Sequence, residues 1–183
     1  MADTPLSGKR VAIFVDDGVS LRELTDARAL LTAAGATVVL VAASTKVPYR
    51  DKAGTTDIAA DAGSPALRAT DFDGLVIPGG HAPDRIRMRH AMVEFVVALV
   101  AAGKPVAAIC HGPQVLITAN VLKGRTLTCW PSIAVDVKNA GGRYVDRPAV
   151  RDGVIITGRK GDDVPAVMAV FIEALAEPSA ATS

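Results

Sequence analysis

The sequence predicts an α/β fold: a doubly wound, mostly parallel sheet with helices on both faces. Short, continuous apolar runs recur along the chain, which is typical of parallel strands buried on both sides. Segments with apolar residues at helical spacing separate these runs. Half of the 183 residues are hydrophobic, only 4% are aromatic, and small or aliphatic types dominate, so helices and strands can pack closely.

The first half of the chain predicts three strands and one helix. The strands are the apolar runs at 11–15, 37–42 and 74–77. The helix begins at Leu21 and ends at Gly35, because glycine readily adopts the left-handed backbone of a helix cap. Between 44 and 70, prolines and glycines predict loops and a short hairpin.

The second half predicts two strands, four helices and one short extended segment. The strands are 106–109 and 154–157, and the extended segment is 126–128. The helices are 92–100 before Gly103, 113–121, 133–140, and a final apolar stripe that ends at Leu175 and is capped by Asp162 or Asp163. No repeat or linker divides the chain, so we expect one domain over 1–183, with its core at about 9–175 and flexible ends.

Charge and cysteine content argue against several classes of protein. The formal net charge is +1, so neither nucleic acid nor an anionic membrane is an expected partner. We interpret the basic run at 85–90 as a solvated helix face rather than an anion site. Two cysteines and no signal-peptide pattern give no disulfide framework. No apolar stretch reaches the ~18 residues of a membrane span, so we expect a cytoplasmic protein.

Cys110 is the residue around which we expect the function. An apolar strand runs into this thiol, and a helix begins directly after it. A sharp strand-to-helix turn can present a nucleophile at a cleft, and a helix N-terminus can lower the pKa of a thiol. We therefore predict that Cys110 is a nucleophile with a lowered pKa. The alternative is an inert, buried cysteine.

Three loops at the carboxyl edge of the predicted sheet carry the other candidates. Glu23 follows the first strand, Gly79-Gly80-His81 follows the third, and Cys110-His111 follows the fourth. Sites in open parallel sheets lie at this edge. The two glycines permit close approach of a ligand, and the N–H groups of Gly80 and His111 form a predicted oxyanion hole.

The acid–base residues stay open at this point. Glu23 reads as a solvated helix-face charge, and the alternative is a protonated hydrogen-bond donor or an acid–base group. His111 adjoins the nucleophile, but neighbouring side chains on a tight turn usually diverge, so His81 and His90 are rival bases. Three histidines without paired spacing predict no metal site, and no glycine-rich nucleotide motif is present, so we expect no cofactor.

Several motifs in the same order resemble the ThiJ/PfpI (DJ-one/PfpI) superfamily, from Lys9 to about Leu175. These motifs are Val76-Ile77-Pro78-Gly79-Gly80-His81-Ala82-Pro83-Asp84, Ala108-Ile109-Cys110-His111-Gly112-Pro113-Gln114, Leu122-Lys123-Gly124-Arg125-Thr126-Leu127-Thr128, Trp130-Pro131-Ser132, Asn139-Ala140-Gly141 and Gly158-Arg159-Lys160-Gly161-Asp162-Asp163-Val164-Pro165. The chain looks most similar to PfpI-type intracellular cysteine proteases and deglycases. The resemblance implies a flavodoxin-like sandwich of the kind shared with class I glutamine amidotransferases.

The resemblance also implies roles for individual residues. Cys110 matches the nucleophile, Glu23 the carboxyl group that hydrogen-bonds the thiolate, and His111 the catalytic histidine. Asp84 matches a carboxylate that a neighbouring subunit supplies, so a homo-oligomer is implied, either a dimer or a hexamer built of dimers. The PfpI-like branch of the superfamily usually has glutamate at the position of Asp84. The same branch often carries a second acidic residue where this chain has Ser20. We interpret Cys129 as a packing residue.

Three functions follow as hypotheses. The first is a cysteine-dependent enzyme of glyoxalase or deglycase type, acting on a small reactive aldehyde and protecting the cell under stress. The second is an intracellular cysteine peptidase, which needs a competent base as well as the same nucleophile. The third is a non-enzymatic, redox-responsive stress protein whose accessible thiol oxidises to a sulfenic or sulfinic acid.

Overall fold

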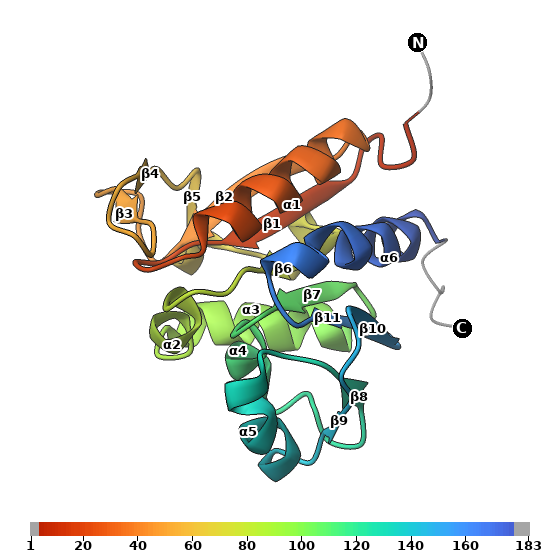
Figure 1. The fold of residues 1–183 in the computed structure, drawn as a ribbon. Helices are drawn as coiled ribbons and strands as arrows, with labels where there is room; N and C mark the ends of the chain where they lie inside the picture. The colour runs from red at the N-terminus through yellow and green to blue at the C-terminus, as the bar shows by residue number, and fades with distance from the viewer. Residues whose placement is uncertain (1–3, 178–183) are drawn as a thin grey trace.

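The computed structural model describes residues 4–177 and contains a seven-stranded sheet (Figure 1). Of the predicted flexible ends, about 1–8 and 176–183, residues 1–3 and 178–183 lie outside the described residues, whereas Leu6 is fully buried. Across the sheet the strands are β10 Ala149–Asp152, β11 Ile155–Gly158, β7 Val106–Ile109, β6 Gly74–Ile77, β1 Arg10–Phe14, β2 Thr37–Ala42 and β5 Ala62–Gly63. Every neighbouring pair is parallel except β10 and β11. This arrangement confirms the predicted α/β class.

Helices cover both faces of this sheet. They are α1 Leu21–Ala33, α2 Ala82–Ile86, α3 His90–Ala101, α4 Pro113–Thr118, α5 Ala134–Asn139 and α6 Val164–Ala176. Figure 1 shows α1 and α6 side by side on one face, with α3 and α4 on the other. Within residues 4–177, no helix is both long and apolar enough to cross a bilayer.

Several smaller elements lie outside the seven-stranded sheet. An antiparallel hairpin pairs β3 Tyr49–Arg50 with β4 Asp57–Ile58, as the loop composition predicts. A second small sheet pairs β8 Thr126–Leu127 with β9 Arg143–Tyr144 in parallel. Four single turns of 3₁₀-helix occur at Ser64–Ala66, Ala69–Asp71, Pro131–Ile133 and Gly161–Asp163.

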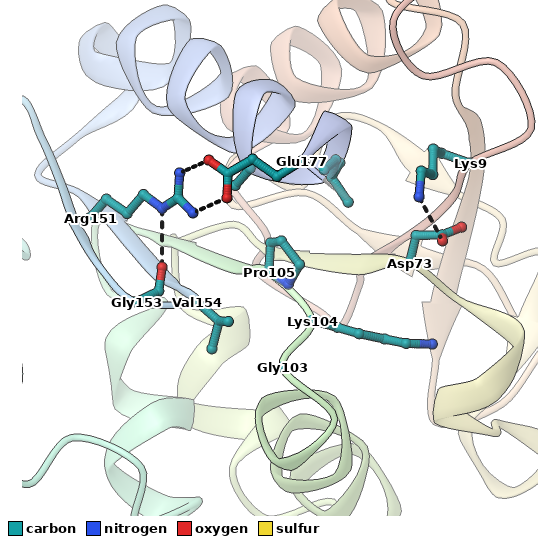
Figure 2. Close-up of a pocket in the computed structure, with 11 residues that line it drawn as sticks. Lys9, Asp73, Gly103, Lys104, Pro105, Arg151, Gly153, Val154 and Glu177 are labelled. Carbon is teal, nitrogen blue, oxygen red and sulfur yellow. Dashed lines mark hydrogen bonds and ion pairs between the residues drawn. The ribbon is translucent and has the colours of Figure 1, made fainter. Parts of the chain in front are cut away.

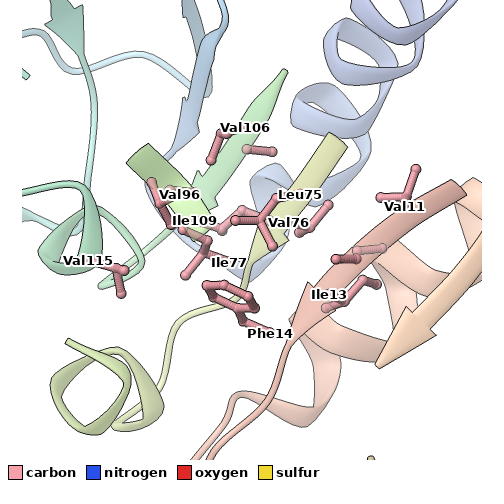
Figure 3. Packing of buried hydrophobic residues seen from close by; sticks show 14 of the residues in the cluster. Val11, Ile13, Phe14, Leu75, Val76, Ile77, Val96, Val106, Ile109 and Val115 are labelled. Carbon is pink, nitrogen blue, oxygen red and sulfur yellow. The ribbon is translucent and has the colours of Figure 1, made fainter. Parts of the chain in front are cut away.

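The core lies between the sheet and its two helical layers (Figure 3). Phe14, Ile77, Val96 and Ile109 are fully buried, and Figure 3 shows them converging from three strands and α3. Each such side chain contributes about 1.5–3 kcal/mol on burial. Because β1, β6 and β7 are buried on both faces, their carboxyl ends are held in fixed relative positions, and the loops of the site leave from these ends.

Several predicted boundaries are confirmed. The runs at 37–42, 74–77 and 106–109 are β2, β6 and β7 without any change of bounds. The end of α1 at Gly35 is also confirmed, since Gly35 has a φ of 96°. There the Gly35 N–H donates to Thr32 and the Ala36 N–H to Leu31, both at 3.0 Å, as in a Schellman cap.

Other predictions were wrong. The helix predicted over 113–121 stops at Thr118, because Asn120 takes a left-handed φ of 56°. The basic run at 85–90 is not one helix face, since α2 ends at Ile86 and α3 begins at His90. Asp163 occupies the N-cap position of α6 but makes no side-chain cap bond there, because its carboxylate binds Arg159 instead.

Candidate active site

Cys110 sits on a strained elbow between β7 and α4. Its φ is 59°, a left-handed value that non-glycine residues rarely adopt and that costs about 1–3 kcal/mol. Two hydrogen bonds hold it there: the Cys110 N–H donates to the Gly158 carbonyl at 3.0 Å, and the Trp130 N–H donates to the Cys110 carbonyl at 2.9 Å. The fold therefore maintains this conformation from both sides, which is expected where strain serves a function.

The thiol faces a pocket of about 280 Å³ at the carboxyl edge of the sheet. The pocket is lined by Ser20, Glu23, Lys52, Gly80, Cys110, His111, Trp130, Lys160 and Gly161. These residues follow β1, β3, β6, β7, β8 and β11 in the chain. The structure thus brings four of the predicted site residues into one cavity, and they come from three separate segments, as the position of each after a strand predicts.

Glu23 is buried within this pocket wall, with 4% of its surface exposed. Its Oε2 accepts a hydrogen bond of 2.6 Å from the Gly79 N–H. The interpretation of Glu23 as a solvated helix-face charge was therefore wrong: helix α1 turns this position toward the core. Burial raises the pKa of the Glu23 carboxyl group, and the Gly79 N–H opposes that rise.

The two glycines after β6, Gly79 and Gly80, have different structural roles. A Cβ on Gly79 would lie 2.6 Å from the Cys110 Cβ and 2.9 Å from Glu23 Oε2, so no larger residue fits. The Gly79 N–H is used by Glu23 and does not face the thiol. Gly80 has a φ of 84°, and its backbone N–H, like that of His111, lowers the pKa of Cys110. These two N–H groups therefore lie at the sulfur, where the sequence predicts an oxyanion hole.

The pKa of the Cys110 thiol is nevertheless raised, to about 11. Burial is the largest cause, and the negative charge of Glu23 is the second. The prediction of a lowered pKa was therefore wrong. Helix α4 has only six residues, and a buried carboxylate lies close by. A protonated Glu23 would remove the second cause, so the proton on Glu23 controls how readily the sulfur ionises.

His111 lies beside the sulfur rather than turning away from it. Its Nδ1 is 3.3 Å from Cys110 Sγ, and its Nε2 is 3.5 Å from Ser132 Oγ. The imidazole stacks on the Trp130 ring with a centroid separation of 6.3 Å. Burial lowers the pKa of His111, and the charges of Lys52 and His81 add to this effect. A neutral imidazole at neutral pH can accept or relay the thiol proton.

Asp84, His81 and His90 do not line the pocket at Cys110. Asp84 and His81 line a neighbouring groove of about 610 Å³ together with Met88 and His111. Asp84 is exposed on α2, and within residues 4–177 of one chain no hydrogen bond links it to His111. His90 is exposed at the start of α3. A single chain therefore leaves the predicted Cys–His–Asp arrangement incomplete.

Two lysines of the pocket were missed by the sequence analysis as functional residues. Lys160 lies in the turn before α6, and Lys52 lies in the β3–β4 hairpin. The Lys52 N–H donates to the Val19 carbonyl at 2.8 Å, and this contact docks the hairpin against the loop before α1. No local pattern marks Lys52, because only this long-range pairing places it at the site. Among the described residues, no group of three His, Cys, Asp or Glu side chains is arranged to hold a metal ion.

A second pocket of about 320 Å³ opens at the amino edge of the same sheet (Figure 2). Its polar side chains bind one another. Arg151 forms a two-fold ion pair with Glu177 at 2.6 and 2.7 Å, and Lys9 pairs with Asp73 at 3.4 Å. Lys104 Nζ caps the carbonyls of Ala69 and Phe72. This pocket holds no nucleophile, so the pocket at Cys110 is the candidate active site.

The sequence matches several known proteins. The family model described as the DJ-1/PfpI family matches residues 9–174. Protein/nucleic acid deglycase 2 of Escherichia coli is 37% identical over 159 residues, which are 86% of this chain and 92% of that protein. The putative cysteine protease YraA of Bacillus subtilis is 39% identical over 158 residues, 86% of this chain and 93% of that one.

Solved structures show the same fold. The DJ-1/ThiJ/PfpI-like and ferritin-like two-domain protein of Anabaena variabilis superposes with a TM-score of 0.89 at 34% identity, over 96% of this chain. The match spans only 52% of that protein. This chain also covers less than two thirds of the length of several archaeal relatives, and four of these relatives are named deglycases.

Proposed function

Because the chain belongs to the DJ-1/PfpI family, we propose that it is a cysteine-dependent enzyme of glyoxalase or deglycase type that acts on reactive carbonyl compounds. The observation that carries this proposal is the elbow at Cys110, which holds a half-buried thiol against a small pocket beside two backbone N–H groups. A pocket of about 280 Å³ suits a small aldehyde.

In the proposed reaction the Cys110 thiol first loses its proton through His111 to solvent. The resulting thiolate attacks the aldehyde carbon of methylglyoxal, and the carbonyl oxygen becomes an alkoxide. The N–H groups of Gly80 and His111 donate to this oxygen. Burial favours the protonated form of Glu23, and this form delivers its proton to the alkoxide. The product of this step is a hemithioacetal, and Glu23 is left as a carboxylate.

The next steps need no external oxidant. The hydrogen on the former aldehyde carbon leaves as a proton, through an enediol, and a proton is added to the neighbouring carbon. The first carbon is thereby oxidised to a thioester, and the second is reduced to an alcohol. Glu23 as carboxylate or His111 as neutral imidazole can carry this proton. Water then hydrolyses the thioester, which yields lactate and restores the thiol.

Formation of lactate from methylglyoxal tests the proposal. We expect Cys110→Ala to reduce turnover by at least about a thousandfold, because Cys110 is the one thiol among the residues that line the pocket. The matched control is Cys129→Ala, since Cys129 is fully buried and should not be required. Turnover that survives Cys110→Ala would show that the reaction does not use this thiol.

Peptide hydrolysis is a second candidate, and the groove of about 610 Å³ beside His111 favours it. Because Asp84 does not reach His111 within one chain, this function needs an Asp84 from a second copy. We therefore propose a homo-oligomer, a dimer or a hexamer built of dimers, for this activity. Cleavage of peptides should then fall both on dilution below the association range and in Asp84→Asn. Cleavage that is independent of both would exclude this arrangement.

A redox-responsive role is the third candidate, and it rests on the exposure of the two thiols. Cys110 is half-buried while Cys129 is fully buried, so peroxide should oxidise Cys110 first. The raised pKa of Cys110 keeps the sulfur protonated at neutral pH and disfavours rapid oxidation. Mass spectrometry of the two cysteines after exposure to peroxide compares them, and equal oxidation would remove this candidate.

A further inference from the structure

We propose that the pocket at Cys110 selects carbonyl compounds that also carry a carboxylate, and that Lys52 binds this carboxylate, with Lys160 as a second cation. This inference rests on the proposed function, since it names the substrate class for the same thiol. A small aldehyde could be held by the oxyanion hole alone. The charges that line the pocket indicate that the preferred substrate has a negative group as well.

The charges of the lining are the first observation. Among the nine lining residues, Lys52 and Lys160 are the two cations and Glu23 is the single carboxylic acid. Glu23 is turned inward, accepts from the Gly79 N–H and has a raised pKa. Its carboxyl group is therefore buried in the pocket wall and bound to the backbone. Two ammonium groups in the lining of the pocket attract an anion.

The second observation is that Lys52 has no anionic partner. Between residues 4 and 177, no carboxylate lies within ion-pair distance of Lys52, whereas Arg50 of the same hairpin pairs with Asp57 at 3.1 Å. Lys160 is less available, because its Nζ lies 3.4 Å from Asp162. Asp162 in turn binds Arg22 more closely, at 2.7 Å. Lys52 is therefore the principal cation available to a ligand.

The third observation is that the backbone of Lys52 is fixed before any ligand arrives. The buried Asp51 carboxylate accepts hydrogen bonds from the N–H groups of Ala53, Thr55 and Thr56 at 3.0, 2.7 and 2.6 Å. These bonds close the turn and satisfy the Asp51 charge. The Lys52 N–H adds the bond of 2.8 Å to Val19. Only the lysine side chain must become ordered on binding, which lowers the entropic cost.

Lys52 also lines the same pocket as the reacting groups. Its ammonium group lowers the pKa of Glu23, on α1, and of Cys110 and His111, on the turn between β7 and α4. A substrate whose carbonyl carbon meets the sulfur can therefore place an attached carboxylate next to Lys52 within the same small pocket.

Two roles of Lys52 must be separated by experiment: binding a substrate anion and stabilising the thiolate. Alkylation of Cys110 by iodoacetate and by iodoacetamide separates them. Both reagents react with the same thiolate, so the ratio of their rates does not depend on the fraction ionised. The two differ in that iodoacetate carries the carboxylate that the proposal requires. The rates are measured on the full chain at about pH 9, and Cys110→Ala gives the background.

We expect the ratio of iodoacetate to iodoacetamide rates to exceed that of a small free thiol. Lys52→Gln should lower the ratio about three- to tenfold at low salt, and Lys160→Gln should lower it less. Lys52→Arg should retain it. Lys46→Gln is the matched control, since it removes the same charge from an exposed residue outside the pocket. Salt at about 0.5 M should reduce the wild-type ratio by screening.

Two results would overturn the inference. One is a wild-type ratio no higher than that of a free thiol. The other is an equal loss of both rates in Lys52→Gln, which would assign Lys52 to the thiolate alone. The alkylation assay needs no turnover, so it is independent of the proposed function. If methylglyoxal is not converted but the ratio of iodoacetate to iodoacetamide rates depends on Lys52, the proposed anion site is supported and the proposed glyoxalase reaction is excluded.

Discussion

The two ends of the same four strands make an informative comparison. Strands β1, β6, β7 and β11 run from the amino-edge pocket of about 320 Å³ to the carboxyl-edge pocket of about 280 Å³. Both pockets are lined by lysines and carboxylic acids. At the amino edge these groups bind one another or cap carbonyl groups, as Figure 2 shows for Arg151 with Glu177.

At the carboxyl edge the same residue types are left unpaired or are held in costly states. Cys110 keeps a left-handed backbone, Glu23 is buried with a raised pKa, and Lys52 has no carboxylate partner among the described residues. The left-handed backbone and the buried carboxyl group cost free energy that the core of the sheet must offset. This difference shows that charged residues in the lining of a pocket do not by themselves identify the active site of this protein. The strained backbone at Cys110, the buried carboxyl group of Glu23 and the ammonium group of Lys52, unpaired within residues 4–177, distinguish the carboxyl-edge pocket from the amino-edge pocket.

The largest loss of turnover in this comparison is expected at a glycine of the carboxyl edge, and a glycine of the amino edge serves as its control. Gly79→Ala should lower turnover by about a hundredfold or more, because its Cβ would displace Cys110 and Glu23. It should also destabilise the fold by about 1–3 kcal/mol. Gly103→Ala, at the amino-edge pocket, meets no atom within 4 Å but has a φ of 70°. It should cost about 1–2 kcal/mol of stability and leave turnover unchanged. Steady-state kinetics and urea unfolding of both variants measure the contrast, and equal losses of turnover would contradict it.

A comparable loss of turnover is expected at Glu23. In Glu23→Gln the pKa of Cys110 should fall below about 11, because the negative charge that raises it is gone. Thiolate therefore forms at lower pH, and the midpoint of Cys110 alkylation should shift to lower pH. Turnover should nevertheless drop about 10²-fold or more, since glutamine cannot deliver the proton. The pH profile of alkylation and the kcat are measured on the same samples. A midpoint that stays or rises would contradict the charge assigned to Glu23.

The smallest effect is expected at the amino edge. Arg151→Gln breaks the ion pair with Glu177, whose pKa Arg151 lowers. A lowered carboxyl pKa stabilises the fold above the usual value of 4.5, and this stabilisation is lost as the pH falls through the folded pKa. The Tm of the variant should fall by at most about 2 °C at pH 7, and the difference should shrink below pH 4. A loss of turnover in this variant would show that the two pockets are coupled.

The sequence predicts the strands of the core because their signal is local. The apolar runs of β2, β6 and β7 are short and continuous, and they fold with the predicted bounds. Strand β10 was missed because it is a half-exposed edge strand with Arg151 and Asp152 in its sequence, and it pairs on one side only. Helix α2 was missed because its five residues are too few to show a period.

The candidate site could be predicted only in part, because only some of its features have a local sequence signal. The elbow at Cys110 and the turn at Gly79-Gly80 are local patterns, and the structure places Cys110 and Gly80 in one pocket. The burial of Glu23 depends on how α1 packs, so its sequence alone indicates a solvated charge. The raised pKa of Cys110 follows first from the burial of the thiol itself and second from the charge of Glu23, and both depend on tertiary packing. Lys52 reaches the site through a hairpin that pairs with Val19, a contact that no sequence period encodes.

The most direct test of the central claim is a crystal structure of the protein exposed to methylglyoxal. We predict electron density continuous with Cys110 Sγ, with one oxygen of the adduct within hydrogen-bond reach of the Gly80 and His111 N–H groups. An unmodified Cys110, with the carbonyl compound bound elsewhere or attached only to lysines, would contradict the claim.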